Sequence, residues 1–134
     1  MKLSNTPAPQ WEYPELTVNI LRGIVKDAVE GHNGGAPCKG VRKVGLVGSM
    51  ARGEQSRVSD VDLMLDSSCF YEDLSMLGKY IGYVLDHKYN KRLDITDFQF
   101  IMDVVEGIKN VDEIWLYRDG YERMLEEVIW LYGQ

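Results

Sequence analysis

Apolar and polar positions follow two different periods along this chain, and together they predict a fold that mixes helices and strands. Over residues 16–30 the apolar positions recur at helical spacing, which is typical of an amphipathic helix. The four positions that share this face are Leu16, Ile20, Ile24 and Ala28. Residues 31–40 contain four glycines and a proline, a composition that predicts a loop.

The remaining segments alternate between short apolar runs and longer periodic stretches. The predicted strands are residues 41–47, 61–65, 92–96 and 113–117. The predicted helical segments are residues 50–54, 72–86, 98–108 and 121–132, with a turn at Asp119-Gly120 before the last of them. This order predicts an α/β (α+β) fold, a mixed sheet with helices packed largely on one face.

The length of 134 residues fits one domain, because most domains hold about 100–150 residues. Residues 1–15 hold three prolines and no apolar run, which indicates an N-terminal extension and not a secretory signal. We therefore expect a single domain over residues 16–134. The sequence holds no apolar stretch of the ~20 residues that a membrane helix needs. The two cysteines favour neither a disulfide framework nor a metal site, so a cytoplasmic protein is expected.

The formal net charge is −6, with 15 lysines and arginines against 21 aspartates and glutamates. Proteins that follow a nucleic-acid backbone usually carry a basic face, since phosphate contacts supply most of the non-specific affinity. The charge therefore argues against long DNA or RNA as the substrate.

Two aspartates open the second predicted strand. Asp60 and Asp62 are two positions apart, so on a strand they share a face, about 7 Å apart along the chain. Two carboxylates on one face repel each other unless a cation lies between them. Mg²⁺ binds proteins through one or two carboxylates, together with substrate phosphates. An isolated pair of this kind is more often a solvated strand edge.

Gly48-Ser49 ends the preceding strand. Glycine lets a phosphate approach the backbone, serine offers a hydroxyl and an amide hydrogen, and a helix beginning here would favour an anion. On its own the dipeptide is more often an ordinary strand exit with a serine helix cap. With the acid pair it forms one unit: strand, Gly-Ser, ten residues, then Asp-x-Asp.

The run G-S-M-A-R-G-E-Q-S-R-V-S-D-V-D-L resembles the signature of the DNA polymerase β-like nucleotidyltransferases, in particular the minimal nucleotidyltransferase family. This resemblance implies that Gly48, Ser49, Arg52 and Ser59 bind nucleotide. It implies that Asp60 and Asp62 hold Mg²⁺, as one or two ions that Mn²⁺ can replace. A third carboxylate is also implied; Asp94 is the first choice and Asp97, near the next helix, is the alternative.

Two residues of the motif carry open interpretations. Many family members have a basic residue after Gly-Ser, whereas this chain has Met50, which removes one phosphate contact. Arg52 either contacts phosphate or braces the loop through Glu54.

By resemblance, the expected activity is transfer of AMP from ATP to a hydroxyl. The expected acceptor is a small helical HEPN-type protein, with this chain acting as the antitoxin of a toxin–antitoxin pair. Transfer to an aminoglycoside-type small molecule is the second alternative. A domain that keeps the fold but only senses nucleotide or binds a partner is the third.

Overall fold

The computed structural model describes residues 12–31, 36–54, 60–107 and 115–133. Its helices are α1 (Val18–Glu30), α2 (Gly48–Ala51), α3 (Phe70–Val84), α4 (Phe98–Val105) and α5 (Trp115–Glu127), with a π-helical turn at Leu85–Tyr89. Its strands are β1 (Val41–Val47), β2 (Val61–Ser67), β3 (Leu93–Asp97) and β4 (Ile129–Tyr132). None of the described helices is both long and apolar enough to cross a membrane.

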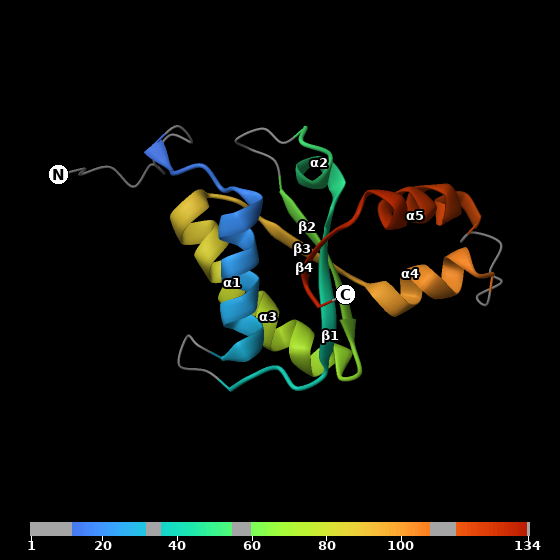
Figure 1. Cartoon of the computed structure of the whole chain (residues 1–134), viewed down its shortest axis with the longest axis horizontal. Coiled ribbons are helices and arrows are strands. Elements are labelled where there is room, and N and C mark those ends of the chain that lie inside the picture. The colour runs from blue at the N-terminus through green and yellow to red at the C-terminus, as the bar shows by residue number, and fades with distance from the viewer. Residues whose placement is uncertain (1–11, 32–35, 55–59, 108–114, 134) are drawn as a thin grey trace.

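The four strands form one mixed sheet in the order β3-β2-β1-β4. β1 pairs antiparallel with both β2 and β4, whereas β2 and β3 run parallel. The parallel pair requires a crossover, and α3 with the π-helical turn supplies it between the two strands. The ends of β1 and the starts of β2 and β3 therefore meet at one end of the sheet, where α2 also lies (Figure 1).

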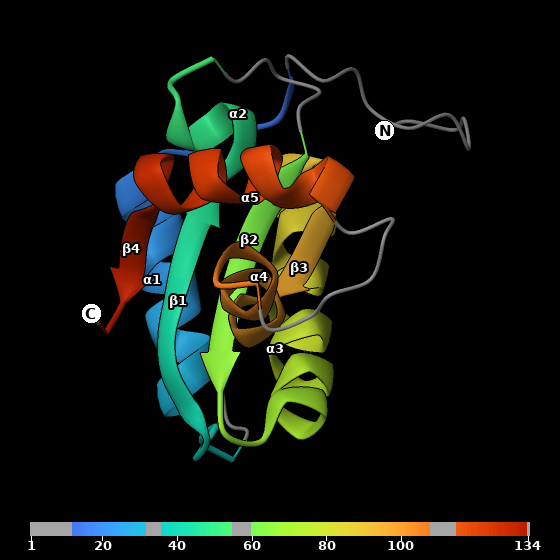
Figure 2. The ribbon, with the colours of Figure 1, turned by 90° about the vertical axis from the view of Figure 1, so that its right-hand side faces the viewer.

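Helices cover both faces of this sheet (Figures 1 and 2). α1 and α3 pack on one face, which we call the main-core face, where Leu21, Leu46 and Leu77 belong to the larger cluster of buried residues. α4 and α5 lie on the other face, which we call the α4–α5 face, over a smaller cluster with Val47 and Met64 at its centre. The mixed sheet is confirmed, but the prediction that helices pack largely on one face is wrong for α4 and α5.

Further sequence predictions are corrected near the C-terminus and in the first helix. Of the strand predicted at residues 113–117, residues 113–114 lie outside the described residues and residues 115–117 begin α5. Asp119-Gly120 lies inside that helix and not in a turn, and the last four residues of the helix predicted at 121–132 form β4 (Ile129–Tyr132). Pairing with β1 supplies the backbone hydrogen bonds of β4, a long-range gain that local periodicity does not report. Of the apolar face predicted for the first helix, Leu16 and Ala28 are buried, whereas Ile20 is 40% exposed and the buried face of α1 is centred on Leu21 and Val25.

Alternation along β2 divides its side chains between the two faces. Leu63 and Leu65 belong to the main cluster, and Met64 belongs to the cluster under α4 and α5. Since side chains on a strand alternate with a period of two, Asp62 shares the face of Met64. Asp62 is thus directed to the side of the sheet on which α5 packs (Figure 2).

Candidate active site

Asp62 and Asp94 are direct neighbours across the parallel pair of strands, with their Cα atoms in register. Registered residues on adjacent strands place their side chains on the same face. Asp97 lies three positions after Asp94, so alternation directs it to the opposite face. It is also occupied elsewhere, since its side chain accepts a hydrogen bond of 3.0 Å from the Gln99 amide as the N-cap of α4. The structure therefore pairs Asp94, and not Asp97, with Asp62.

Asp60 lies immediately before β2 and is exposed. Asp62 is half-buried, and burial raises the pKa of its carboxyl group; the charges of Asp94 and Asp60 raise this pKa further, while Arg52 opposes them. A raised carboxyl pKa means that the folded protein disfavours the charged form. Negative charge thus accumulates here without full compensation by the protein.

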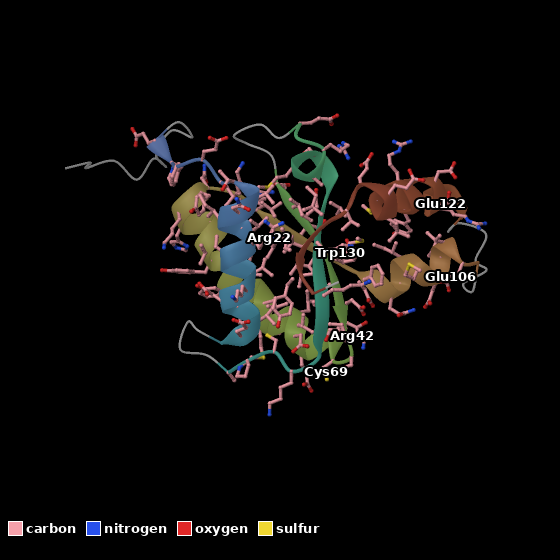
Figure 3. All side chains as sticks on the ribbon, in the orientation of Figure 1. Arg22, Arg42, Cys69, Glu106, Glu122 and Trp130 are labelled. Carbon is pink, nitrogen blue, oxygen red and sulfur yellow. The ribbon has the colours of Figure 1, made fainter. Side chains whose placement is uncertain are left out.

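Asp60, Asp62 and Asp94 differ from two neighbouring acids, Asp66 and Asp73, in the hydrogen bonds and ion pairs that their side chains make among the described residues. Asp66 forms an ion pair with Arg42 at 2.6 Å, and Asp73 accepts a hydrogen bond of 2.6 Å from Ser67. Figure 3 shows Arg42 near the end of the sheet opposite to α2. Within the described ranges, the side chains of Asp60, Asp62 and Asp94 make no hydrogen bond or ion pair of this kind. These carboxylates remain available for a ligand.

A metal ion would meet only oxygen donors here, which suits a hard cation such as Mg²⁺. The described part of the chain nevertheless holds no group of three or more histidine, cysteine, aspartate or glutamate side chains gathered closely enough to hold an ion as they stand. The Asp62–Asp94 pair fits a hard cation by its chemistry and its uncompensated charge, but a three-carboxylate site is not preassembled.

Both the backbone conformation and the contact with Asp62 favour glycine at position 48. Its φ of 77° lies in the left-handed region that glycine tolerates best. A Cβ atom at this position would overlap with the Asp62 carboxylate, because the Gly48 backbone packs directly against Oδ2 of that side chain. The glycine of the Gly-Ser motif therefore makes room for the acid of the next strand.

Ser49 lies inside α2, whose N-cap is Val47 with no side-chain hydrogen bond. The interpretation of Ser49 as a helix cap is therefore wrong. Its side chain is half-buried and has no hydrogen-bond partner among the residues described. Ser59 lies outside the described residues.

Met50 is 4% exposed and belongs to the main hydrophobic cluster. The side chain at this position therefore packs into the core and does not reach the acids. A basic residue here would have to bury its charge, at a large cost in free energy. The departure from the usual family motif is accounted for by packing.

Arg52 forms ion pairs at both ends of its guanidinium. Nε donates to Glu54 at 2.9 Å and Nη1 donates to Glu127 at 3.4 Å. Glu127 ends α5, so these contacts tie the loop after α2 to that helix (Figure 1). The structure favours the bracing interpretation of Arg52 and adds a partner, Glu127, that sequence spacing did not indicate.

Lys91 is a further residue that sequence reasoning missed. It is only 8% exposed, and burial lowers the pKa of its ammonium group while Asp60 opposes that shift. Its position three residues before Asp94 was the only available signal in the sequence. Lys91 therefore brings positive charge next to Asp60.

A search of curated proteins finds no match to this chain. The family model described as "Nucleotidyltransferase domain" matches residues 23–119, which is more than half of the 134 residues. The match includes α2, β2 and β3, and so Gly48, Asp62 and Asp94. The chain belongs to the nucleotidyltransferase domain family.

Proposed function

We propose that this chain transfers AMP from ATP to a hydroxyl group of a small helical HEPN-type partner protein, as the antitoxin of a toxin–antitoxin pair. Membership of the nucleotidyltransferase domain family supports the reaction class. The observation that carries the proposal at this site is the Asp62–Asp94 pair, held in register on adjacent strands and free of structural partners among the described residues.

Asp62 and Asp94, with Asp60, would hold Mg²⁺, which would supply charge neutralisation at the phosphates of ATP. Ser49 would donate its hydroxyl to a phosphate oxygen. Gly48 would keep that phosphate close to the acids, because the absent side chain leaves only backbone between them. The half-buried Asp62 would bind a cation more favourably than a fully exposed acid, since its charged form is poorly solvated in the folded protein.

The charge of the chain bears on the nature of the acceptor. A chain of 134 residues with a net charge of −6 provides little basic surface for a long nucleic acid. The family resemblance then favours a protein hydroxyl, with an aminoglycoside-type small molecule as the alternative acceptor.

The test is incubation of the protein with ATP labelled at its α-phosphate, Mg²⁺ and the product of a HEPN-type gene encoded beside it. We expect label on the partner protein. Asp62→Asn should reduce this labelling roughly a hundredfold or more, because a metal ligand acts on charge that develops in the transition state. Asp103→Asn is the matched control: it makes the same chemical change on α4, where Asp103 accepts only a hydrogen bond from Gln99.

Equal labelling by wild type and Asp62→Asn would exclude catalysis at this site. Label on an aminoglycoside and not on the partner would favour the small-molecule alternative.

Nucleotide sensing without transfer is the outcome that would replace catalysis in this proposal. A sensor would bind ATP in a Ser49-dependent manner and label no acceptor.

A further inference from the structure

An open groove runs between α3 and β3, with a volume of about 590 Å³. Its apolar floor is formed by Leu74, Leu93 and Ile95. Leu93 and Ile95 flank Asp94 along β3, so alternation directs them to the main-core face while Asp94 points to the other. The groove is therefore separate from the Asp62–Asp94 pair, although it lies along the strand that carries Asp94.

Two glycines of α3 keep the wall of this groove open. Gly78 and Gly82 lie one turn apart and both line the groove. A Cβ atom built at either position meets nothing within 4 Å. Each glycine inside a helix costs about 1 kcal/mol relative to alanine. Packing in the core would therefore tolerate larger residues at these two positions. With glycine there, another backbone has space to approach α3 closely.

The groove is basic in a chain that is acidic overall. Lys79, Lys91 and Arg92 line it against one acid, Asp86. Asp86 lies 3.6 Å from the imidazole Nδ1 of His87. Lys79 and Arg92 are exposed and have no ion pair within the described ranges. Concentrated positive charge on a protein of net charge −6 favours an acidic ligand over a neutral one.

β3 is the outermost strand on its side of the sheet formed by the described residues. The outer edge of such a strand presents backbone donors and acceptors, which an extended segment of another chain can pair with. Side chains of an added strand would alternate, and every second one would face the groove. The apolar floor then suits apolar residues, and the basic rim suits acidic ones.

We propose that this α3–β3 groove docks an extended segment of the protein acceptor that combines acidic and apolar residues. The acceptor role rests on the proposed function, whereas the docking itself does not. Two contacts connect the groove to the acids. Lys91, which lines the groove, interacts electrostatically with Asp60. The carbonyl of Arg92, another lining residue, accepts a hydrogen bond of 2.9 Å from the amide of Val61, which lies between Asp60 and Asp62. A segment bound here would hold the acceptor beside the start of β2, where Asp60 and Asp62 lie.

Single-stranded nucleic acid is the competing occupant. Among the described residues that line the groove, three cations are few for a ligand that is held mainly by phosphate contacts, and no aromatic side chain is available for base stacking. An acidic peptide with apolar side chains uses both the rim and the floor.

The test is selection of a displayed library of random 12-residue peptides on the immobilised full chain, without nucleotide. The selected peptides should be enriched in acidic and apolar residues. Their binding is then measured by fluorescence anisotropy against two groove variants, Gly82→Leu and the double variant Lys79→Glu/Arg92→Glu. We expect each to weaken binding about tenfold or more. The matched controls on α1 are Gly23→Leu, which also adds a side chain into open space, and Lys26→Glu. Both should change the affinity less than about twofold.

Three outcomes would overturn the proposal: no acidic enrichment among the selected peptides, unchanged binding by Gly82→Leu with an unchanged melting temperature, or tighter binding of a 20-residue oligouridylate that competes with the peptides. Asp62→Asn separates docking from catalysis, because it should bind peptide normally while losing transfer. Peptide binding that depends on the groove in a protein that labels no acceptor would refute the proposed transfer and leave docking intact. Transfer that is insensitive to every groove variant would refute the acceptor role of the groove.

Discussion

The backbone of Gly48 packs directly against the carboxylate of Asp62, so that the end of β1 and the start of β2 leave no room for a side chain between them. In the sequence, Gly48 lies twelve positions before Asp60 and fourteen before Asp62. The antiparallel pairing of β1 with β2 makes them a single site.

Gly48→Ala should therefore damage the site as well as the stability. The new methyl group must adopt a left-handed backbone conformation, at a cost of about 1 kcal/mol, and must also displace Asp62. Gly53→Ala is the matched control, since Gly53 has a φ of 72° but open space around it. In urea unfolding, the free energy of unfolding should fall by about 1 kcal/mol in Gly53→Ala and by more than that in Gly48→Ala. Only Gly48→Ala should lose AMP transfer; a comparable loss in both would contradict a specific role for the contact.

Asp94 and Asp97 should separate chemistry from stability. Asp94→Ala removes the registered partner of Asp62 and should reduce transfer about a hundredfold or more, with little change in unfolding free energy. Asp97→Ala removes the N-cap of α4 and should cost about 1 kcal/mol of stability, while the folded protein keeps its activity. Initial rates at saturating ATP and urea melts measure the two effects. If Asp97→Ala proved the inactive variant, the assignment of the third carboxylate would be reversed.

The raised pKa of Asp62 predicts a pH-dependent stability difference between wild type and Asp62→Asn. A carboxyl whose pKa is higher in the folded state stabilises the protein below its ordinary pKa of about 4, and this contribution is lost as pH rises through the folded value. In metal-free buffer at pH 7, Asp62→Asn should therefore be more stable than wild type. This difference in unfolding free energy between Asp62→Asn and wild type should become smaller as the pH falls toward 4. Urea melts at a series of pH values measure it, and a gap that widens at low pH would contradict the shift.

Added Mg²⁺ should make wild type more stable than Asp62→Asn, the reverse of the order expected in metal-free buffer. An ion that binds only the native state stabilises it, and wild type keeps the full set of carboxylates. The melting temperature of wild type should rise with Mg²⁺, and rise further with ATP, whereas Asp62→Asn should respond weakly. Identical responses would place the metal elsewhere.

Arg52 and Glu127 should act as one unit. If Arg52 braces the loop after α2, then Arg52→Ala and Glu127→Ala should weaken ATP binding by similar, small factors, because exposed pairs contribute about 0.2–1 kcal/mol. The double variant should then add little to either single one. Isothermal titration with a non-hydrolysable ATP analogue measures all three. A much larger loss for Arg52→Ala alone would indicate direct contact with phosphate.

Ser49→Ala should weaken nucleotide binding more than it slows transfer at saturation. A hydrogen bond to a charged group is worth about 1.5–3 kcal/mol, which corresponds to roughly a ten- to hundredfold change in affinity. Because the contact already exists in the bound ground state, most of the loss should appear in KM. Ser68→Ala is the control, at an exposed serine whose hydroxyl makes only long contacts, with the Gly40 carbonyl at 3.4 Å and with the Cys69 sulfur at 3.9 Å. An effect confined to kcat would exclude ground-state phosphate binding by Ser49.

The sequence by itself determined the parts of this protein that are local. The periodicity of residues 72–86 predicted α3, and the apolar run of residues 41–47 predicted β1, because buried faces impose their own spacing on a chain. The motif from Gly48 to Asp62 identified the family, since the Gly-Ser and Asp-x-Asp motifs lie within fifteen consecutive residues.

Only the tertiary structure decided which residues meet across the chain. The choice of Asp94 over Asp97 depends on the register between β2 and β3, which both strands and the crossover helix set together. The same holds for Arg52 with Glu127 and for the position of Lys91 near Asp60. β4 escaped prediction because its hydrogen bonds come from β1, more than eighty residues earlier. Contacts between distant segments depend on how the whole sheet closes, and no local pattern of residues carries that information.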